Sequence, residues 1–405
     1  MLVGVLPLLS ALATEPRAAM QSAGLLGWLG AGLLSASLLL MVREPAFAAW
    51  FGGLERMYRW HHALGTLGYV ALLAHVLALA AALLPESPAA AWRAVAPWTQ
   101  DWTGIAGWLA LVGLMAGLAG TFAMRLPYTF WRRLHLSLAA AVVLGLAHVV
   151  AVSGFSASAG LAVTPALVAI AWRLLRADRG MSARPYEVVT VSRPARDIVE
   201  VTLRPLGAPL SIAPGQFVMG AFFEGPRYRG CGEYHPFTVS GIGQGGLLTV
   251  TIKALGDCTR DIQALERGVA ARIQGPYGAF LTGRPPVPEL WIAGGIGITP
   301  FMAVLRSHAI TRPTTLIYAF QDARDTAYLE EIEFLAKAQP LLQYHPLAIQ
   351  DDIRPIDALL ETIPDLGTRQ AYLCGPPPMV AAVMSRLRER GLQSDRIHTE
   401  RYDLR

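Results

Sequence analysis

The sequence predicts a multi-domain membrane protein in which a transmembrane helix bundle precedes an antiparallel β-barrel and an α/β domain with a parallel sheet. The chain has 405 residues, of which 53% are hydrophobic and only 16% are charged, whereas about 25% are charged in typical soluble proteins. The charge is also unevenly spread, because the N-terminal half has long stretches without acidic or basic residues. These two observations exclude a wholly soluble enzyme and a protein embedded in the membrane throughout.

Three domains are expected, with boundaries at 1–180, 184–284 and 288–405. Near residue 184 the composition changes from apolar runs to short alternating strands with Gly and Pro turns, and a Pro-rich joint lies at 285–288. These lengths suit the roughly 100–200 residues of a typical domain.

The membrane domain is predicted to contain six spans, or five if its first apolar run is cleaved. Residues 1–14 form a short span or a signal peptide, since Ala11–Ala13 resembles a cleavage site. The missing basic n-region favours the span. The other apolar stretches are long enough to cross the roughly 30 Å hydrocarbon layer, and they lie at 22–42, 60–84, 102–124, 131–152 and 160–176.

Arginines in the loops predict the orientation. Arg17 and Arg93 lie on one side of the bundle, and the positive-inside rule therefore makes the opposite side cytoplasmic. We expect a multi-pass protein of the inner membrane with its C-terminal domains in the cytoplasm. The absence of a basic run argues against nucleic-acid binding. The arginines of the cytoplasmic side are Arg43, Arg56, Arg59, Arg125, Arg132, Arg133, Arg173, Arg176 and Arg179.

Five of the nine histidines lie on only two spans. His61 and His75 are fourteen residues apart, so they share a helix face about 21 Å apart in height. His135 and His148 are thirteen apart on a parallel span, which leaves a rotation of about 140° that a bend or tilt must absorb. His61 then lies level with His135, and His75 with His148. Each level offers the two imidazoles that a haem iron with two axial histidines needs.

Other interpretations of these histidines remain open. A single intramembrane histidine is more often satisfied by an interhelical hydrogen bond than by a metal. His62 is expected to be structural or to face a haem propionate, because His61 fits the fourteen-residue spacing better.

The β-barrel is predicted from strands at 186–192, 198–204 and 247–253. Residues 214–218 form a turn that leads into a strand. The next segment, 235–240, offers an apolar surface and hydroxyl groups that could hold a flat heteroaromatic ring. A helix predicted over 259–266 offers its N-terminal N–H groups to a pyrophosphate. The candidate binding residues are His235, Pro236, Phe237, Thr238, Val239 and Ser240, together with Lys253, Gly256, Asp257, Cys258 and Thr259.

The last domain alternates strands at 289–293, 314–320, 341–348, 369–374 and 396–400 with helices that are clearest at 325–338 and 376–390. This pattern predicts a doubly wound parallel sheet, whose ligands bind at the carboxyl edge. Two glycine-containing segments follow strands at that edge. The candidate residues in them are Gly294, Gly295, Gly297, Ile298, Thr299 and Pro300, followed by Cys374, Gly375 and Pro376.

The three cysteines all lie in the polar half of the chain. The spacing of Cys231, Cys258 and Cys374 predicts neither a metal-ligand cluster nor a disulfide framework. This fits a reducing compartment.

Taken in order, these residues resemble the ferric reductase and NADPH oxidase superfamily over essentially the whole chain. The histidine spacings match those of its haem-bearing spans, and residues 235–238 read HPFT, its flavin motif. Residues 253–259 resemble its flavin-pyrophosphate segment, and residues 294–300 and 374–379 resemble its nicotinamide-nucleotide motifs.

The resemblance implies FAD, two b-type haems and NADPH or NADH as cofactors. Three residues are expected to be catalytic: Thr238 near the flavin N5, Cys374 beside the nicotinamide, and Tyr402 stacked on the flavin. Two positions depart from the family pattern. The first is Leu79, where the superoxide-producing members have an additional histidine. Arg324 is the candidate to replace the usual reader of the 2′-phosphate, after Gln321 and Asp322.

The implied function is a flavohaem oxidoreductase of the NAD(P)H oxidase or ferric reductase type. It would pass electrons from cytoplasmic NAD(P)H to an extracytoplasmic acceptor, either oxygen or a ferric chelate, within membrane lipid. One alternative is an electron-delivering membrane subunit that serves a periplasmic partner protein. Another is a membrane-tethered flavin reductase without haem, against which the two histidine levels argue.

Overall fold

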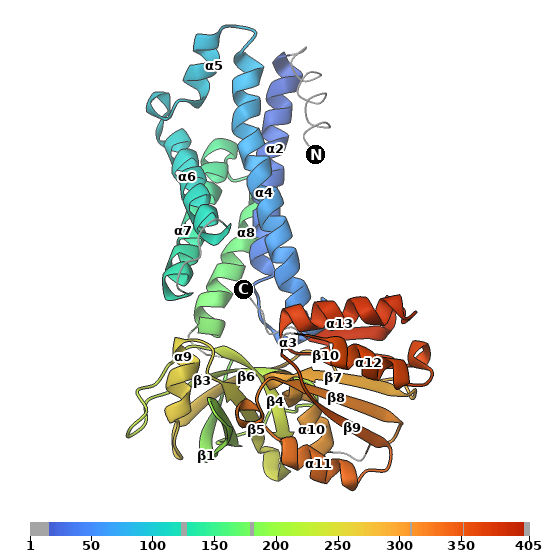
Figure 1. The fold of residues 1–405 in the computed structure, drawn as a ribbon. Helices are drawn as coiled ribbons and strands as arrows, with labels where there is room; N and C mark the ends of the chain where they lie inside the picture. Colours follow the sequence, from blue (N-terminus) through green and yellow to red (C-terminus); the bar gives the residue numbers. More distant parts are fainter. Residues whose placement is uncertain (1–15, 123–127, 179–181, 308–309, 351, 401–405) are drawn as a thin grey trace. The chain divides into compact units, whose positions relative to one another are not determined.

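The computed structural model describes residues 16–122, 128–178, 182–307, 310–350 and 352–400. The run at 1–14, predicted as a span or signal peptide, lies outside these residues. The chain divides into two compact units (Figure 1). The first comprises residues up to Arg43 and Arg56–Arg176, and the second comprises Glu44–Glu55 and everything from Ala177 onward.

Helices are the only regular secondary structure in the described residues of the first unit. Four of its helices are long and apolar enough to cross a membrane, over Ala18–Leu39, Leu54–Leu83, Trp102–Thr121 and Ala157–Arg176. The predicted span at 131–152 falls on another helix, which has a shorter apolar stretch, Ser137–Ser153. The elements are α2 (Pro16–Leu39), α4 (Leu54–Leu83), α5 (Pro88–Val95), η1 (Pro97–Thr99), α6 (Trp102–Phe122), α7 (Tyr128–Ser153), α8 (Ala157–Trp172) and the π-helical η2 (Arg173–Asp178).

Small residues and caps set the local structure of this bundle. Helix α6 packs on α7 where a Cβ at Gly113 would approach Ala141 to 2.9 Å, and small residues let helix backbones come close in a membrane. Ser156 caps α8 by accepting a hydrogen bond from the Ala159 N–H at 3.2 Å. Such a cap satisfies one of the backbone donors that a helix start leaves unpaired.

The second unit begins with a closed antiparallel barrel in the order β1-β2-β5-β4-β3-β6. Strand β2 shows the alternation that the sequence predicted, since Val199, Val201 and Leu203 point into the core. The predicted helix at 259–266 is shorter, because α9 ends at Asp261 and a 3₁₀ turn follows. The strands are β1 (Arg184–Ala195), β2 (Ile198–Pro205), β3 (Phe217–Phe222), β4 (His235–Ile242), β5 (Leu248–Lys253) and β6 (Ala270–Tyr277). The helices of this unit so far are α3 (Pro45–Trp50), η3 (Gln244–Gly246), α9 (Asp257–Asp261) and η4 (Ile262–Ala264).

The barrel is followed by a five-stranded parallel sheet in the order β11-β10-β7-β8-β9, and all five predicted strands are present. Helices α10 and α11 cover one face and α12 and α13 the other (Figure 1). The strands are β7 (Glu289–Gly294), β8 (Thr314–Phe320), β9 (Leu342–Ala348), β10 (Gln370–Cys374) and β11 (Ile397–Glu400). The helices are η5 (Gly295–Ile298), α10 (Thr299–Ser307), η6 (Ala323–Asp325), α11 (Leu329–Lys337), α12 (Arg354–Thr362), η7 (Leu366–Thr368), α13 (Pro377–Glu389) and η8 (Ser394–Arg396).

The strand order places the ligand-binding edge of this sheet. The chain proceeds from β7 outward to β9 and then returns to β10 on the other side of β7. In open α/β sheets, ligands bind in the crevice where the order reverses. That point lies between β7 and β10.

Candidate functional site

Two histidine pairs lie in the helical unit, one at each predicted level. At the first level, the ring centroids of His61 on α4 and His135 on α7 are 6.2 Å apart. Two imidazoles bound to one metal at about 2 Å each would have centres roughly 6 Å apart. The His61 Nδ1 lies 2.9 Å from the Ser37 carbonyl oxygen, so Nε2 is the nitrogen offered to a metal.

His135 completes this first pair from α7. The Trp131 ring stacks on its imidazole at 4.9 Å. Its Nδ1 is buried and makes no hydrogen bond within the described residues. His62, the neighbour of His61, is exposed on the helix surface. The geometry thus pairs His61, and not His62, with His135.

At the second level, His75 and His148 line one apolar cavity of about 240 Å³. The Nδ1 of His75 hydrogen-bonds the Ala23 carbonyl at 2.7 Å, and that of His148 the Thr103 carbonyl at 2.8 Å. A metal-bound histidine almost always donates its second ring N–H in this way. Other residues that line the cavity are Trp28, Leu72, Leu79, Trp108, Leu111 and Leu146.

Glycines make room for the outer pair. A Cβ at Gly27 would come within 3.1 Å of the His75 ring, and a Cβ at Gly107 within 3.1 Å of the His148 ring. Paired imidazoles, fixed tautomers and an apolar cavity are the features that a haem with two axial histidines requires. The outer pair, His75 and His148, shows all three features and fits such a group. The first pair, His61 and His135, offers two imidazoles at a suitable distance.

A second cavity, of about 500 Å³, lies in the second unit. The side chain of Thr238 is 4% exposed and that of Glu400 is 8% exposed. Within the described residues, Thr238 Oγ1 and Glu400 Oε2 are buried without a hydrogen-bond partner. Because buried polar atoms are nearly always satisfied, the pair indicates a polar ligand. The cavity is lined by segment 45–55 and by Gln216, Phe217, Pro236, Thr238, Tyr277, Gly278, Phe280 and Glu400, among others.

Strand β4 divides the predicted motif between two faces. Pro236 and Thr238 line the cavity, whereas Phe237 and Val239 lie in the barrel core. This is the alternation of any strand. The Ser240 hydroxyl accepts a hydrogen bond from Thr251 Oγ1 at 2.7 Å. The side chains of the motif that are available to a ligand in this cavity are therefore those of Pro236 and Thr238.

Sequence reasoning missed several residues of this cavity. Gly278 has φ +84°, and a Cβ there would lie 3.1 Å from the Phe217 ring. The turn at 214–218 predicts only the start of a strand at Phe217, not a place for it in the cavity. Glu400 is brought in by β11, where burial, and to a smaller extent the neighbouring Glu55, raises its pKa to about 8.

The segment predicted to bind a pyrophosphate forms a compact turn after β5. Thr259 Oγ1 accepts hydrogen bonds from the N–H groups of Leu255 at 2.9 Å and Gly256 at 2.8 Å. Gly256 and Asp257 are exposed, and Lys253 is partly exposed. The Thr259 side chain thus shapes the turn.

The two nucleotide motifs meet at the switch point of the sheet. A Cβ at Gly297 would lie 2.2 Å from the Cys374 carbonyl oxygen, so only glycine fits there. A Cβ at Gly375 would come within 3.0 Å of the Gly294 backbone. Thr299 and Pro300 begin helix α10 directly after this contact. The motif after β7 and the motif after β10 therefore form one backbone cradle with Cys374 buried in it.

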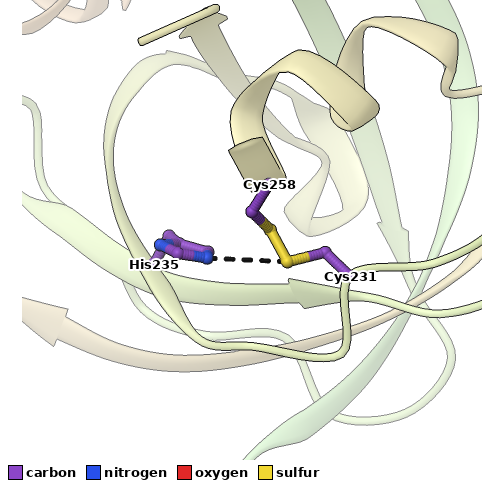
Figure 2. A group of neighbouring side chains, drawn as sticks. All are labelled: Cys231, His235 and Cys258. Carbon is purple, nitrogen blue, oxygen red and sulfur yellow. Dashed lines mark hydrogen bonds between the residues drawn. A yellow bond between two sulfur atoms is a disulfide. The ribbon is translucent and has the colours of Figure 1, made fainter. Parts of the chain in front are cut away.

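The prediction about the cysteines is wrong. Cys231 and Cys258 are joined in a disulfide with a Cα–Cα distance of 5.6 Å, and His235 Nε2 lies 3.6 Å from Cys231 Sγ (Figure 2). The two cysteines are 27 residues apart. They meet because β4 pairs with both β3 and β5, which brings the β3–β4 loop beside the turn after β5. Tyr402, the predicted flavin-stacking residue, lies outside the described residues.

Comparison with known proteins finds one family match in the N-terminal half of the chain and one in the C-terminal half. Residues 26–146 match the family described as ferric reductase like transmembrane component, and residues 291–385 match the oxidoreductase NAD-binding domain. The naphthalene 1,2-dioxygenase system ferredoxin–NAD(P)(+) reductase component of Pseudomonas putida is 25% identical over 229 residues, which are 53% of this chain and 67% of that protein. The propane 2-monooxygenase reductase component of Rhodococcus jostii is 30% identical over 159 residues, which are 34% of this chain and 43% of that protein.

Among solved structures, the FAD/NAD-binding domain of a nitric oxide dioxygenase from Vibrio cholerae matches with a TM-score of 0.47 and 21% identity. That match covers 54% of this chain and 98% of the other. The chain spans only part of the length of the two curated relatives. The resemblance drawn from the sequence is confirmed: this polypeptide combines a ferric-reductase-like transmembrane domain with an NAD-binding oxidoreductase domain.

Proposed function

We propose that the protein is a transmembrane oxidoreductase that moves electrons from cytoplasmic NAD(P)H to oxygen or a ferric chelate on the opposite side of the membrane. When bound, FAD would take the hydride and release electrons singly to two b-type haems that span the bilayer. The observation that carries the proposal is the pair of histidine levels on α4 and α7. Imidazole pairs at two levels could hold the two haems that such an electron path needs.

The residues of the membrane domain would hold the haems and insulate them from solvent. His61 with His135 and His75 with His148 would each hold one haem, which would supply one-electron transfer when bound. The carbonyl groups of Ser37, Ala23 and Thr103 fix ring tautomers.

The residues of the second unit would orient the flavin and the nucleotide. Thr238 and Glu400 would each offer a flavin ring in the cavity one polar atom that has no hydrogen-bond partner among the described residues. The cradle of Gly294, Gly297 and Cys374 would hold a dinucleotide at the sheet edge, and the close packing of its two motifs supports this. Lys253 and Thr259, in the segment that resembles a flavin-pyrophosphate motif, would lie beside the FAD pyrophosphate. His235 would belong to the flavin motif, and Tyr402 would stack on the flavin.

The proposal includes an architecture. It takes 1–180 as the membrane domain, 184–284 as the FAD domain and 288–405 as the nucleotide domain. It counts five spans on α2, α4, α6, α7 and α8, with residues 1–14 as a sixth. It places the protein in the inner membrane with the FAD and nucleotide domains in the cytoplasm. The loop arginines support that orientation.

The test is electron transfer into sealed proteoliposomes that contain a membrane-impermeant acceptor, with NADH or NADPH added outside. His61→Ala should abolish reduction of the enclosed acceptor while the bound flavin is still reduced by nucleotide. His62→Ala is the matched control and should retain most of the wild-type rate, because His62 is exposed. Normal transfer in His61→Ala would refute the haem path, and loss only in His62→Ala would refute the ligand assignment.

A further inference from the structure

We propose that Cys231, Cys258 and His235, with Glu233 as the fourth ligand, form a zinc site in the reduced protein. The cluster lies on the barrel where the β3–β4 loop meets the turn that opens α9 (Figure 2). One ligand atom from each of Cys231, His235 and Cys258 falls within 4.8 Å of the other two. Two thiolates and an imidazole are among the donor sets that tetrahedral Zn²⁺ prefers.

The distances around His235 match those between ligands of one ion. Ligands of zinc at about 2.3 Å for sulfur and about 2.0 Å for nitrogen lie roughly 3.5 Å apart in a tetrahedron. His235 Nε2 is 3.6 Å from Cys231 Sγ and 3.9 Å from Glu233 Oε2. The same ring nitrogen therefore faces both a sulfur and a carboxylate oxygen, as a nitrogen bound to a shared ion would.

Burial also favours a site over a surface cluster. The His235 side chain is 20% exposed and that of Glu233 is 32% exposed, and both cysteines are partly buried. The backbone N–H groups of Cys231 and Gly232 donate to the Phe222 carbonyl at 3.2 and 3.1 Å, which ties the loop to the end of β3. Such a pre-formed loop lowers the entropy lost when an ion binds.

The compartment decides between the two states of the cysteine pair, and here the inference rests on the proposed cytoplasmic orientation. Glutathione and thioredoxin keep cytosolic thiols reduced, and a cysteine cluster in a cytosolic protein is more often metal-binding than structural disulfide. Two molecules of a low-molecular-weight thiol would convert the Cys231–Cys258 disulfide into two thiols and be oxidised to one disulfide. Zn²⁺ would then displace the two thiol protons and form two Zn–S bonds.

An ion at this place would cross-link two segments that carry predicted flavin contacts. His235 begins β4, and Cys258 lies in the turn of residues 253–259. Zinc would hold these segments together without the covalent bond, so the distance between them would be kept in a reducing cytoplasm.

The experiment measures metal and thiols in the full chain, purified anaerobically from membranes in detergent without added reductant. N-ethylmaleimide labelling is quantified by peptide mass spectrometry in three samples: as isolated, after a zinc chelator, and after chelator followed by a phosphine reductant. Elemental analysis gives zinc per chain. We expect about one zinc, with Cys231 and Cys258 protected as isolated and labelled after the chelator alone.

Other labelling patterns would overturn the proposal. Protection that only the reductant removes would mean a permanent disulfide, and full labelling of the isolated protein would mean neither state. The Cys231→Ser/Cys258→Ser double variant should lose the zinc, and Cys374→Ser should keep it as the matched cysteine control. Zinc retained by the double variant would place the ion elsewhere. Because no readout involves electron transfer, failure here is distinct from failure of the proposed function.

Discussion

Single glycines in the helical unit govern how the proposed haem ligands are held. Gly27→Ala would put a methyl group 3.1 Å from the Nδ1 of His75, the nitrogen that hydrogen-bonds the Ala23 carbonyl of the helix that also carries Gly27. The variant should bind about one haem per chain, or show an altered low-spin spectrum, because the ring must turn out of line. Gly32→Ala is the control, since a Cβ there meets nothing within 4 Å. Equal haem spectra in both variants would argue against His75 as a ligand.

Glu400 predicts a dependence of stability on pH. Its folded pKa is raised to about 8 from an ordinary value of 4.5, first by burial and then by Glu55. The folded state therefore binds the proton more tightly, so the contribution of Glu400 to stability is full below about pH 4.5 and is lost as the pH rises through about 8. Glu400→Gln should remove this loss and raise the melting temperature of flavin-free protein at pH 8.5 by roughly 5 °C.

The check is calorimetry of both proteins at pH 5 and pH 8.5. The two melting temperatures should lie close together at the lower pH and diverge at the higher one. A constant difference at both values would show that Glu400 acts through packing and not through its charge.

Arg324 governs the expected choice of nucleotide. Its side chain is 75% exposed, and its guanidinium pairs with Asp322 at 2.9 Å, which offsets the positive charge that a 2′-phosphate would meet. Arg324→Ala should lower kcat/KM for NADPH roughly fivefold and leave NADH unchanged, because one charge-assisted hydrogen bond to the phosphate is lost. Asp322→Asn should shift the preference toward NADPH. A strong NADPH preference that survives Arg324→Ala would locate the phosphate contact elsewhere.

At the scale of elements, one arginine joins the barrel to the parallel sheet. Arg306 at the end of α10 bonds Glu200 of β2 at 2.7 Å and Glu331 of α11 at 2.7 and 2.8 Å. Its guanidinium also lies 4.8 Å from the Tyr328 ring centre. The hydroxyl of Tyr328 hydrogen-bonds Glu200 as well. These contacts come from three elements, so their loss should loosen the packing between the two domains.

Arg306→Met should therefore lower the free energy of unfolding of the second unit by about 2 kcal/mol, as expected for hydrogen bonds to charged groups that are mostly buried. Lys337→Met is the control, because Lys337 and Glu333 are exposed partners four residues apart on α11. Exposed pairs of this kind contribute about 0.3–0.5 kcal/mol. Chemical denaturation followed by near-UV circular dichroism gives both values, and equal losses would refute the role of the network.

At the scale of the whole molecule, the two histidine levels predict a haem content of about two per chain with low-spin b-type spectra. Pyridine haemochrome analysis of protein purified with haem supplementation measures it. His75→Ala should lose one haem and keep flavin reduction by nucleotide. A wild-type chain with no haem after supplementation would leave the flavin reductase without haem as the remaining interpretation.

Periodicity and spacing determined most of the architecture. The apolar runs predicted the helices of the membrane unit, since length and composition suffice where the solvent is lipid. The five strands of the sheet followed from alternation with helices, and the two glycine segments pointed to its carboxyl edge. The histidine pairs followed from helical rise alone, although thirteen residues between His135 and His148 do not share an ideal helix face.

Only the tertiary structure decided which side chains of each motif meet. The alternation of β4 turns Phe237 into the core and Thr238 toward the cavity. The pairing of β4 with both β3 and β5 brings Cys231 beside Cys258 across 27 residues. Glu400 and segment 45–55 join the cavity from opposite ends of the chain. Local patterns specify elements because they depend on neighbours in sequence. Contacts across the barrel depend on strand order, and no local pattern records that order.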